Sequence, residues 1–146
     1  MDASSAILKW TKENEELNKG QNFPHSMRII EDDAIKFIER ELKRGNKYDA
    51  IIMDPPKFGR GPKGEVWKIE DMLPKLLSGV QKILTDRPLF VILTSYAIDS
   101  SSLSLGHALK DSLKDLDGEV NIEELCILEQ GTGRAIPLAN TSLFIY

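Results

Sequence analysis

The stretch "YDAIIMDPPKF", residues 48 to 58, decides the fold of this chain. Its first half is a near-continuous apolar run, which is typical of a strand in a parallel sheet that is covered on both faces. The run ends at Asp54, and Pro55 and Pro56 follow at once. Ligands of open α/β sheets bind beyond the carboxyl ends of the strands, so this aspartate is a candidate functional residue. The simpler alternative is that the two prolines only stiffen a turn.

Hydrophobic periodicity predicts helices and strands that alternate along the rest of the chain. Helices are expected over residues 4–20, 33–47, 69–84 and 100–116, and strands over residues 27–32, 48–54, 88–96, 120–130 and 141–146. The regular part of the third helix is expected to begin near Pro74, because proline is unfavourable inside a helix. Trp10 is expected in the core, and Cys126 in a buried strand.

This alternation predicts an α/β fold with right-handed crossovers and a doubly wound, mostly parallel sheet. The last two strands are separated only by the predicted loop 131–140, which is too short for a parallel crossover. One strand of this C-terminal pair is therefore expected to run antiparallel. The 146 residues, 41% of them hydrophobic, suffice for one domain with a substantial core.

Composition excludes several classes of protein. The apolar runs are too short for a transmembrane helix, and the N-terminus lacks the basic and long apolar segments of a signal peptide. A single cysteine excludes an internal disulfide and favours a reducing compartment, so we expect a cytoplasmic protein. The only histidines, His25 and His107, are far apart in sequence, and no metal site is predicted.

Acidic residues follow three predicted strand ends. Asp2 lies just before the first helix, Asp32 and Asp33 follow the strand over residues 27–32, and Asp54 follows the next strand. Because the carboxyl ends of parallel strands meet at one edge of a sheet, we expect these acids to converge. The first suits ribose hydroxyls, and the second suits an exocyclic amine such as that of adenine. The alternative for the acids that precede helices is N-capping.

The pentapeptide "DPPKF", residues 54–58, resembles motif IV of class I S-adenosylmethionine-dependent methyltransferases, most closely that of the 23S rRNA methyltransferases of the RlmI/RlmK type. The segments "DASSAILKWTKEN", residues 2–14, and "EDDAIKFI", residues 31–38, are similar to the family's segments at the ends of its second and third strands. The resemblance covers essentially the whole chain. It implies a Rossmann-like catalytic domain that methylates RNA, with a base of rRNA as the expected substrate.

The resemblance also implies the cofactor-binding residues. Asp2, with its neighbour Ala3, would bind the ribose hydroxyls of S-adenosylmethionine. Asp33, with its neighbour Asp32, would meet the adenine amine, and the backbone N–H of Ala34 would meet the adenine ring.

Residues of the pentapeptide are implied in catalysis. Asp54, Pro55 and Pro56 would line the pocket near the methyl donor. Lys57 and Phe58 would face the acceptor base, on which Phe58 could stack.

Two features depart from the family pattern. The family's first strand and Gly-rich loop have no counterpart, although that strand is central in the family's sheet order 3-2-1-4-5-7-6. We therefore expect residues 1–146 to form a single catalytic domain that is a fragment of a longer protein. In addition, methylation at C5 of a pyrimidine usually needs a cysteine nucleophile. The segment "LTSYAIDSSS", residues 93–102, has none, and Cys126 lies in a late strand.

Two other classes of function stay open. A nicotinamide-dependent oxidoreductase would also place an acid on a ribose, but the chain has no GxGxxG motif. A non-catalytic relic that binds RNA or a protein partner is the second alternative. The net charge of −4 argues against non-specific coating of nucleic acid, yet the loop after Asp54 could still form a local basic patch. Its basic residues are Lys57, Arg60, Lys63 and Lys68.

Overall fold

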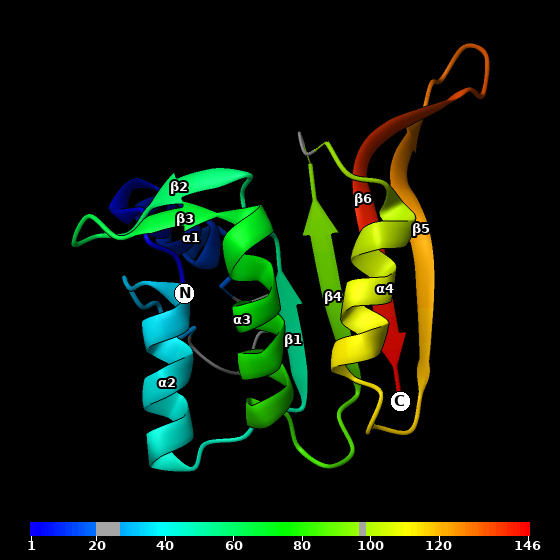
Figure 1. Cartoon of the computed structure of the whole chain (residues 1–146). Helices are drawn as coiled ribbons and strands as arrows, with labels where there is room; N and C mark the ends of the chain where they lie inside the picture. The colour runs from blue at the N-terminus through cyan, green and yellow to red at the C-terminus, as the bar shows by residue number, and fades with distance from the viewer. Residues whose placement is uncertain (20–26, 97–98) are drawn as a thin grey trace.

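The structure, a computed structural model, describes residues 1–19, 27–96 and 99–146. Its main sheet has the strand order β1-β4-β6-β5 (Figure 1). The strands are β1 (Ala50–Met53), β4 (Phe90–Ser95), β5 (Glu119–Leu128) and β6 (Ala135–Ile145). β1 is parallel to β4, whereas β6 is antiparallel to both β4 and β5. The α/β class and the antiparallel C-terminal pair are confirmed. The prediction of a mostly parallel sheet is wrong for the described residues, in which the sheet is mixed.

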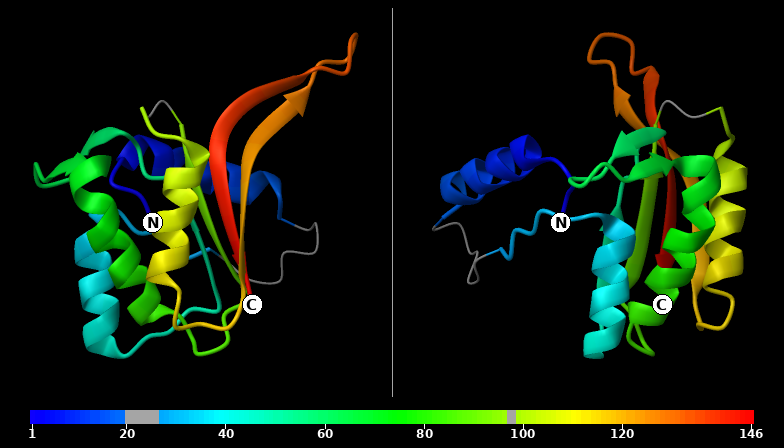
Figure 2. Two further views of the ribbon diagram at one scale, coloured as in Figure 1. Left: turned by 45° about the vertical axis from the view of Figure 1, so that its right-hand side comes forward. Right: turned by 60° about the vertical axis from the view of Figure 1, so that its left-hand side comes forward.

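Three helices lie on one side of this sheet, the last two over its strands and the first beside them, packed on the second (Figures 1 and 2). They are α2 (Ala34–Arg44), α3 (Ile69–Ile83) and α4 (Ser102–Ser112). The core lies between these helices and the sheet, where Val91, Leu93 and Phe144 are fully or almost fully buried. Ile52 points to the other face and is 70% exposed, so the described residues do not cover both faces as the apolar run predicted. Within the described residues, no helix is long and apolar enough to cross a membrane.

Helix α1 (Ser5–Leu17) lies apart from this core (Figure 2). Ser4 caps it by accepting a hydrogen bond from the N–H of Ile7, and none of its residues is buried. Trp10 is 63% exposed, so its predicted place in the core is wrong. The apolar face of α1 was visible in the sequence, but periodicity does not show whether another element covers that face.

The strand predicted over residues 27–32 is reduced to one isolated parallel bridge between Asp2 and Glu31. A small antiparallel hairpin, by contrast, was missed in the loop after Asp54. Its strands are β2 (Phe58–Arg60) and β3 (Val66–Lys68). Helix α3 follows directly and begins at Ile69 as predicted, but it is regular through Pro74, so the expectation that its regular part begins near Pro74 is wrong. Pro74 lacks only its own backbone N–H, and burial of Leu77, Val80 and other apolar residues outweighs that loss.

The β5–β6 hairpin is longer than predicted and projects beyond the helices (Figures 1 and 2). Six of the ten residues of the expected loop 131–140 belong to β6, including Pro137. Proline is tolerated there because β4 pairs with β6 only as far as Asn140. Cys126 lies in the projecting part and is exposed, so its expected burial is wrong.

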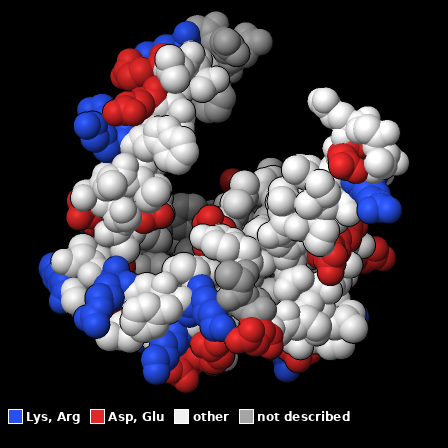
Figure 3. Space-filling view, turned by 90° about the horizontal axis from the view of Figure 1, so that it is seen from above, with Lys and Arg blue, Asp and Glu red and all other residues white. Residues whose placement is uncertain are grey.

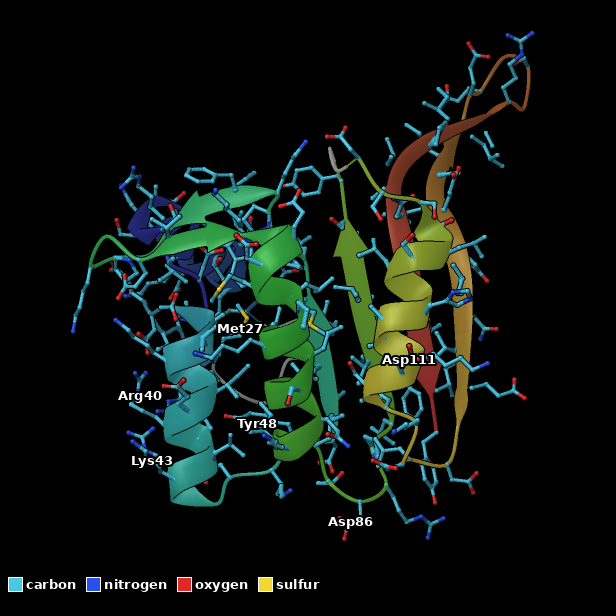
Figure 4. All side chains as sticks on the ribbon, in the orientation of Figure 1. Met27, Arg40, Lys43, Tyr48, Asp86 and Asp111 are labelled. Atoms are coloured by element: carbon cyan, nitrogen blue, oxygen red, sulfur yellow. The ribbon has the colours of Figure 1, made fainter. Side chains whose placement is uncertain are left out.

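A buried carboxylate joins helix α2 to the start of β1. Glu41 is completely buried and accepts hydrogen bonds from Tyr48 at 2.6 Å, Asn46 at 2.7 Å and Arg44 at 2.7 Å. The Tyr48 and Asn46 hydrogen bonds, followed by that of Arg44, lower the pKa of Glu41 to about 2. Burial, together with the Glu41 carboxylate, raises the pKa of Tyr48 to about 12. Tyr48 lies between α2 and α3 (Figure 4), and this cluster fixes the strand that ends at Asp54.

Candidate functional site

The Asp-Pro-Pro-Lys-Phe segment directly follows β1, at the carboxyl end of the sheet's parallel pair. Asp54 and Pro56 are exposed, whereas Pro55 between them is buried. The Asp54 side chain has no hydrogen bond or ion pair within the part of the chain that the structure describes. A carboxylate that directly follows a strand end and is open to solvent is available for a ligand.

Trp67 fixes the backbone of this segment. Its Nε1–H donates a hydrogen bond of 2.6 Å to the carbonyl oxygen of Pro56, and its ring packs partly against the core. Next to it, the N–H of Ile69 donates to the carbonyl oxygen of Lys57 at 3.0 Å. Trp67 thus anchors the loop to the core. The β2–β3 hairpin is therefore tied at its base, and the prolines cannot move independently of it.

Gly59 has a steric role in the same segment. A Cβ at this position would lie 3.4 Å from Cγ of Pro56 and 3.9 Å from Cβ of Trp67. The hairpin thus approaches the second proline closely, and this contact supports the rigid backbone after Asp54.

The side chains of Lys57 and Phe58 differ in their contacts. The Lys57 ammonium lies 2.5 Å from the Asp99 carboxylate, which comes from the segment after β4. This hydrogen bond raises the pKa of Lys57 and lowers that of Asp99. Phe58 is 54% exposed, although it is a large apolar residue. An exposed aromatic ring in the same short segment as a free carboxylate is suited to stacking on a planar ligand.

Asp2 and Asp32 lie close together. The N–H of Asp32 donates to the carbonyl oxygen of Asp2 at 3.0 Å, and Oδ1 of Asp2 accepts from the N–H of Ser4 at 2.7 Å. Ala3, between Asp2 and Ser4 in the chain, is partly exposed. Asp32 also forms an ion pair with Arg40 of α2. Figure 4 shows Arg40 on this helix.

Asp33 is the N-cap of α2. Its side chain accepts a hydrogen bond of 3.0 Å from the N–H of Lys36, and Ala34 is the first residue of the helix. The capping alternative, left open for this residue in the sequence, is thus present in the structure. One carboxylate oxygen serves the cap, while the helix N-terminus provides backbone N–H groups in the same place.

The predicted acids lie on elements that end or begin at a similar level of the fold. Figures 1 and 2 show the N-terminus, the start of α2 and the end of β1 at a similar height, below the β2–β3 hairpin. No described hydrogen bond joins Asp54 to the Asp2–Asp32 pair. No group of three or more metal-ligating side chains occurs among residues 1–19, 27–96 and 99–146, and His25 lies outside these ranges.

The basic residues of the loop do not form a uniform patch. Lys57 is paired with Asp99, and Glu65 in the same loop is paired with Lys36 of α2. The Lys36 hydrogen bond, followed by backbone N–H groups, lowers the pKa of Glu65 to about 2. Figure 3 shows Lys and Arg side chains interleaved with Asp and Glu on this side of the molecule. A phosphate backbone would meet alternating charges here rather than a continuous positive surface.

Curated relatives of the chain are rRNA methyltransferases, although no family model matches it. The chain is 30% identical over 118 residues to ribosomal RNA large subunit methyltransferase K of Neisseria meningitidis, which covers 78% of this chain and 32% of the relative. It is 38% identical over 58 residues to ribosomal RNA large subunit methyltransferase I of an Enterobacter species, which covers 40% of this chain and 14% of the relative.

Solved structures agree with these relatives. The SAM-dependent methyltransferase of Agrobacterium tumefaciens has a TM-score of 0.88 and 37% sequence identity, and the match covers 98% of this chain and 47% of that one. The protein SMU.776 in complex with SAH has a TM-score of 0.71 at 16% identity, covering 98% of this chain and 37% of that one. The second likeness shows the fold alone.

The fold is that of the S-adenosylmethionine-dependent methyltransferases. Within this class, the chain is related to the 23S rRNA methyltransferases of the RlmK and RlmI type. The chain spans about a third of the first curated relative, 32%, and less than half of the Agrobacterium protein, 47%.

Proposed function

We propose that this protein is an S-adenosylmethionine-dependent methyltransferase that acts on a base of rRNA. The observation that carries this proposal is the Asp-Pro-Pro-Lys-Phe segment at the carboxyl end of β1, in a fold with a TM-score of 0.88 to a SAM-dependent methyltransferase. The rRNA substrate is taken from the names of the curated relatives.

The residues near the N-terminus fit the nucleoside part of the cofactor. Asp2 and Asp33 provide carboxylate oxygens that can accept from ribose hydroxyls and from an exocyclic amine. Asp32 would hold the segment around Asp2 and Asp33 in place through its ion pair with Arg40. The small side chains of Ala3 and Ala34 would leave room beside the carboxylates. S-adenosylmethionine supplies an electrophilic methyl group on its sulfonium, and the residues of this chain would bind and orient it.

The segment after β1 would position the acceptor. Pro55 and Pro56 fix the backbone where donor and acceptor must meet, and Trp67 holds the second proline in place. Such positioning can supply a large share of the rate acceleration of a two-substrate reaction. Phe58 would stack on the acceptor base, Lys57 would face it, and Asp54 would hold it or take up a proton.

A further strand would complete the cofactor pocket. Within the described residues, β1 pairs only with β4, and its other edge is open toward the Asp2–Glu31 bridge. An unpaired strand edge leaves its backbone N–H and C=O groups without strand partners, so we infer that a parallel strand from a longer form of the protein pairs with this edge. In this view residues 1–146 are one catalytic domain of that protein.

The proposal is tested by methyl transfer from labelled S-adenosylmethionine to 23S rRNA. Asp54→Ala should reduce transfer at least about 100-fold, the lower range for loss of an acid–base group, and should leave cofactor binding within a factor of about three. Asp86→Ala is the matched control, because Asp86 is exposed at the opposite end of the molecule (Figure 4) and should change neither quantity. Unchanged turnover in Asp54→Ala would contradict the role of this carboxylate. Binding of NAD in place of S-adenosylmethionine would contradict the class of enzyme.

A further inference from the structure

A small pocket lies at the base of the projecting hairpin, where β4 ends. Its volume is about 180 Å³. The lining side chains include Ser95 and Tyr96 from the end of β4, Glu124 from β5, and Leu138 and Asn140 from β6. The pocket is distinct from the acidic corner around Asp2, and the motif after β1 does not line it.

Three of these side chains form one row across the sheet. Ser95 is opposite Asn140, and Asn140 is opposite Glu124 on the next strand. Directly opposite residues of antiparallel strands point to the same face, so a hydroxyl, an amide and a carboxylate lie side by side. The Asn140 amide is already held, because its Nδ2 donates to the carbonyl oxygen of Ser100 at 3.1 Å.

Ser95 gives independent support for a ligand. It is completely buried, and its Oγ has no hydrogen-bond partner among the described residues. Buried hydroxyls are nearly always hydrogen-bonded, and one without a partner at the wall of a pocket indicates that something else supplies it. Tyr96 is adjacent and 52% exposed, which leaves its ring free to cover a planar group.

The size of the pocket limits what it can hold. Pockets for drug-sized ligands begin at about 300 Å³, so 180 Å³ is too small for a whole nucleoside cofactor. The volume suits a single planar ring system. The wall of Leu138 and Pro137 is apolar, and the carboxylate of Glu124 can only accept hydrogen bonds when it is ionised.

The pocket is next to the motif after β1. Met53 is opposite Leu93 in the β1–β4 pair, so Asp54 leaves β1 at the level of Thr94, one residue before Ser95. The Lys57–Asp99 ion pair, with a distance of 2.5 Å, connects the motif to the segment that leaves β4. A ring in the pocket would therefore belong to a molecule that also reaches the motif.

We propose that this pocket binds an extruded RNA nucleobase that donates N–H groups to Glu124. Tyr96 stacks on the face of the base, and Ser95 and Asn140 supply further hydrogen bonds to its edge. Recognition of unstacked bases by aromatic faces and edge hydrogen bonds is the usual way in which proteins distinguish RNA sequences. This inference rests on the proposed function, because it takes RNA as the substrate. The motif that would hold the acceptor base does not line this pocket, so the base bound here is a second one, next to the acceptor, and it adds sequence selectivity.

The test is binding of the 5′-monophosphates of adenosine, guanosine, cytidine and uridine to the chain, measured by calorimetry. One base should bind better than the other three. Glu124→Gln should weaken that binding about 10- to 100-fold, the range for loss of a base-edge contact. Tyr96→Ala should weaken it about tenfold, the range for loss of one stacking contact, and Tyr96→Phe should preserve it.

Glu123→Gln is the matched control. Glu123 is adjacent, is equally a glutamate, and pairs with Thr141 on the opposite face of the same strands. Its substitution should leave nucleotide binding unchanged, and circular dichroism should show the same unfolding temperature for both glutamine variants.

The possible failures can be told apart. Equal binding by Glu124→Gln and Glu123→Gln, or no preference among the four nucleotides, would overturn the pocket assignment, even if methyl transfer to rRNA is intact. Selective, Glu124-dependent binding without transfer to any RNA would support the pocket and contradict the proposed methyltransferase activity.

Discussion

The base and the distal half of the β5–β6 hairpin consist of the same two strands but have opposite surroundings. At the base, Phe144 is 1% exposed and packs in the core with α4 beside it. In the distal half, Leu125 is 50% exposed, Ile127 53% and Leu128 70%. Both halves carry large apolar side chains, so the hydrophobicity of a side chain alone does not decide its burial. The difference is that α4 covers only the base.

The largest effect should follow from truncation at the base. Phe144→Ala removes a buried ring and leaves a cavity between α4 and the sheet, which should lower the free energy of unfolding by about 3–5 kcal/mol. Urea unfolding followed by circular dichroism measures this change. A loss below about 1 kcal/mol would mean that the base is not the stable part of the hairpin.

A smaller effect is expected at the contact between α4 and β5. A Cβ on Gly106 would lie 2.3 Å from Cδ1 of Ile122, so Gly106→Ala should destabilise the protein by about 1–3 kcal/mol. Ile122→Ala in the same chain should remove the clash, and the double variant should be less unstable than the sum of the single changes.

Gly131→Ala in the distal loop is the matched control, because no atom lies within 4 Å of a Cβ there. Its midpoint of urea unfolding should stay at the wild-type value. Additive effects of Gly106→Ala and Ile122→Ala would contradict direct packing of α4 on the base.

Buried and exposed carboxylates should differ in the same way as buried and exposed apolar side chains, because only the buried one contributes to the stability of the fold. The pKa of Glu41 is about 2, below its ordinary value of 4.5, so its ionised form stabilises the fold above about pH 4.5. This contribution should be lost as the pH falls from 4.5 toward 2. Between pH 5 and pH 3, the urea midpoint of wild type should fall further than that of Glu41→Gln. Glu119→Gln, at an exposed position of β5, should retain the wild-type pH dependence. Parallel curves for wild type and Glu41→Gln would exclude the buried carboxylate as the cause.

The smallest effect belongs to the distal half. Leu128→Ala should change the free energy of unfolding by no more than about 0.5 kcal/mol, because this side chain is 70% exposed. The same urea experiment applies. A loss comparable to that of Phe144→Ala would show that the distal half is covered in solution.

Much of the fold could be predicted because its helices and strands have clear periodicity. The apolar run before Asp54 predicted β1, and the helical spacing of apolar residues predicted α2, α3 and α4. The short loop between the last two strands predicted that one of them runs antiparallel, and β6 is antiparallel to both β4 and β5. The motif after β1 was recognised because a carboxylate and two prolines in this order have few other uses.

The remaining features depend on contacts that a single sequence does not contain. The strands of the β2–β3 hairpin have only three residues each and lie in a segment rich in glycine, so they show no hydrophobic periodicity. The hairpin is held instead by the Trp67 hydrogen bond to Pro56 and by the hydrogen bond that the Lys57 carbonyl oxygen accepts. The exposure of Trp10 and Cys126 depends on which faces are covered. The pocket lined by Ser95 could not be predicted, because it depends on which residues of β4, β5 and β6 lie opposite one another. Of its lining residues, only Tyr96, an aromatic residue at a strand end, could have been suspected from the sequence.

The open edge of β1 has a consequence for handling the protein. A strand edge without a partner exposes a row of backbone donors and acceptors that can pair with a strand from another molecule. Here the row lies next to Ile52, an isoleucine that is 70% exposed. Samples of residues 1–146 should therefore form β-rich aggregates more readily as their concentration rises. A charged side chain in place of Ile52 is the change that should keep them in solution.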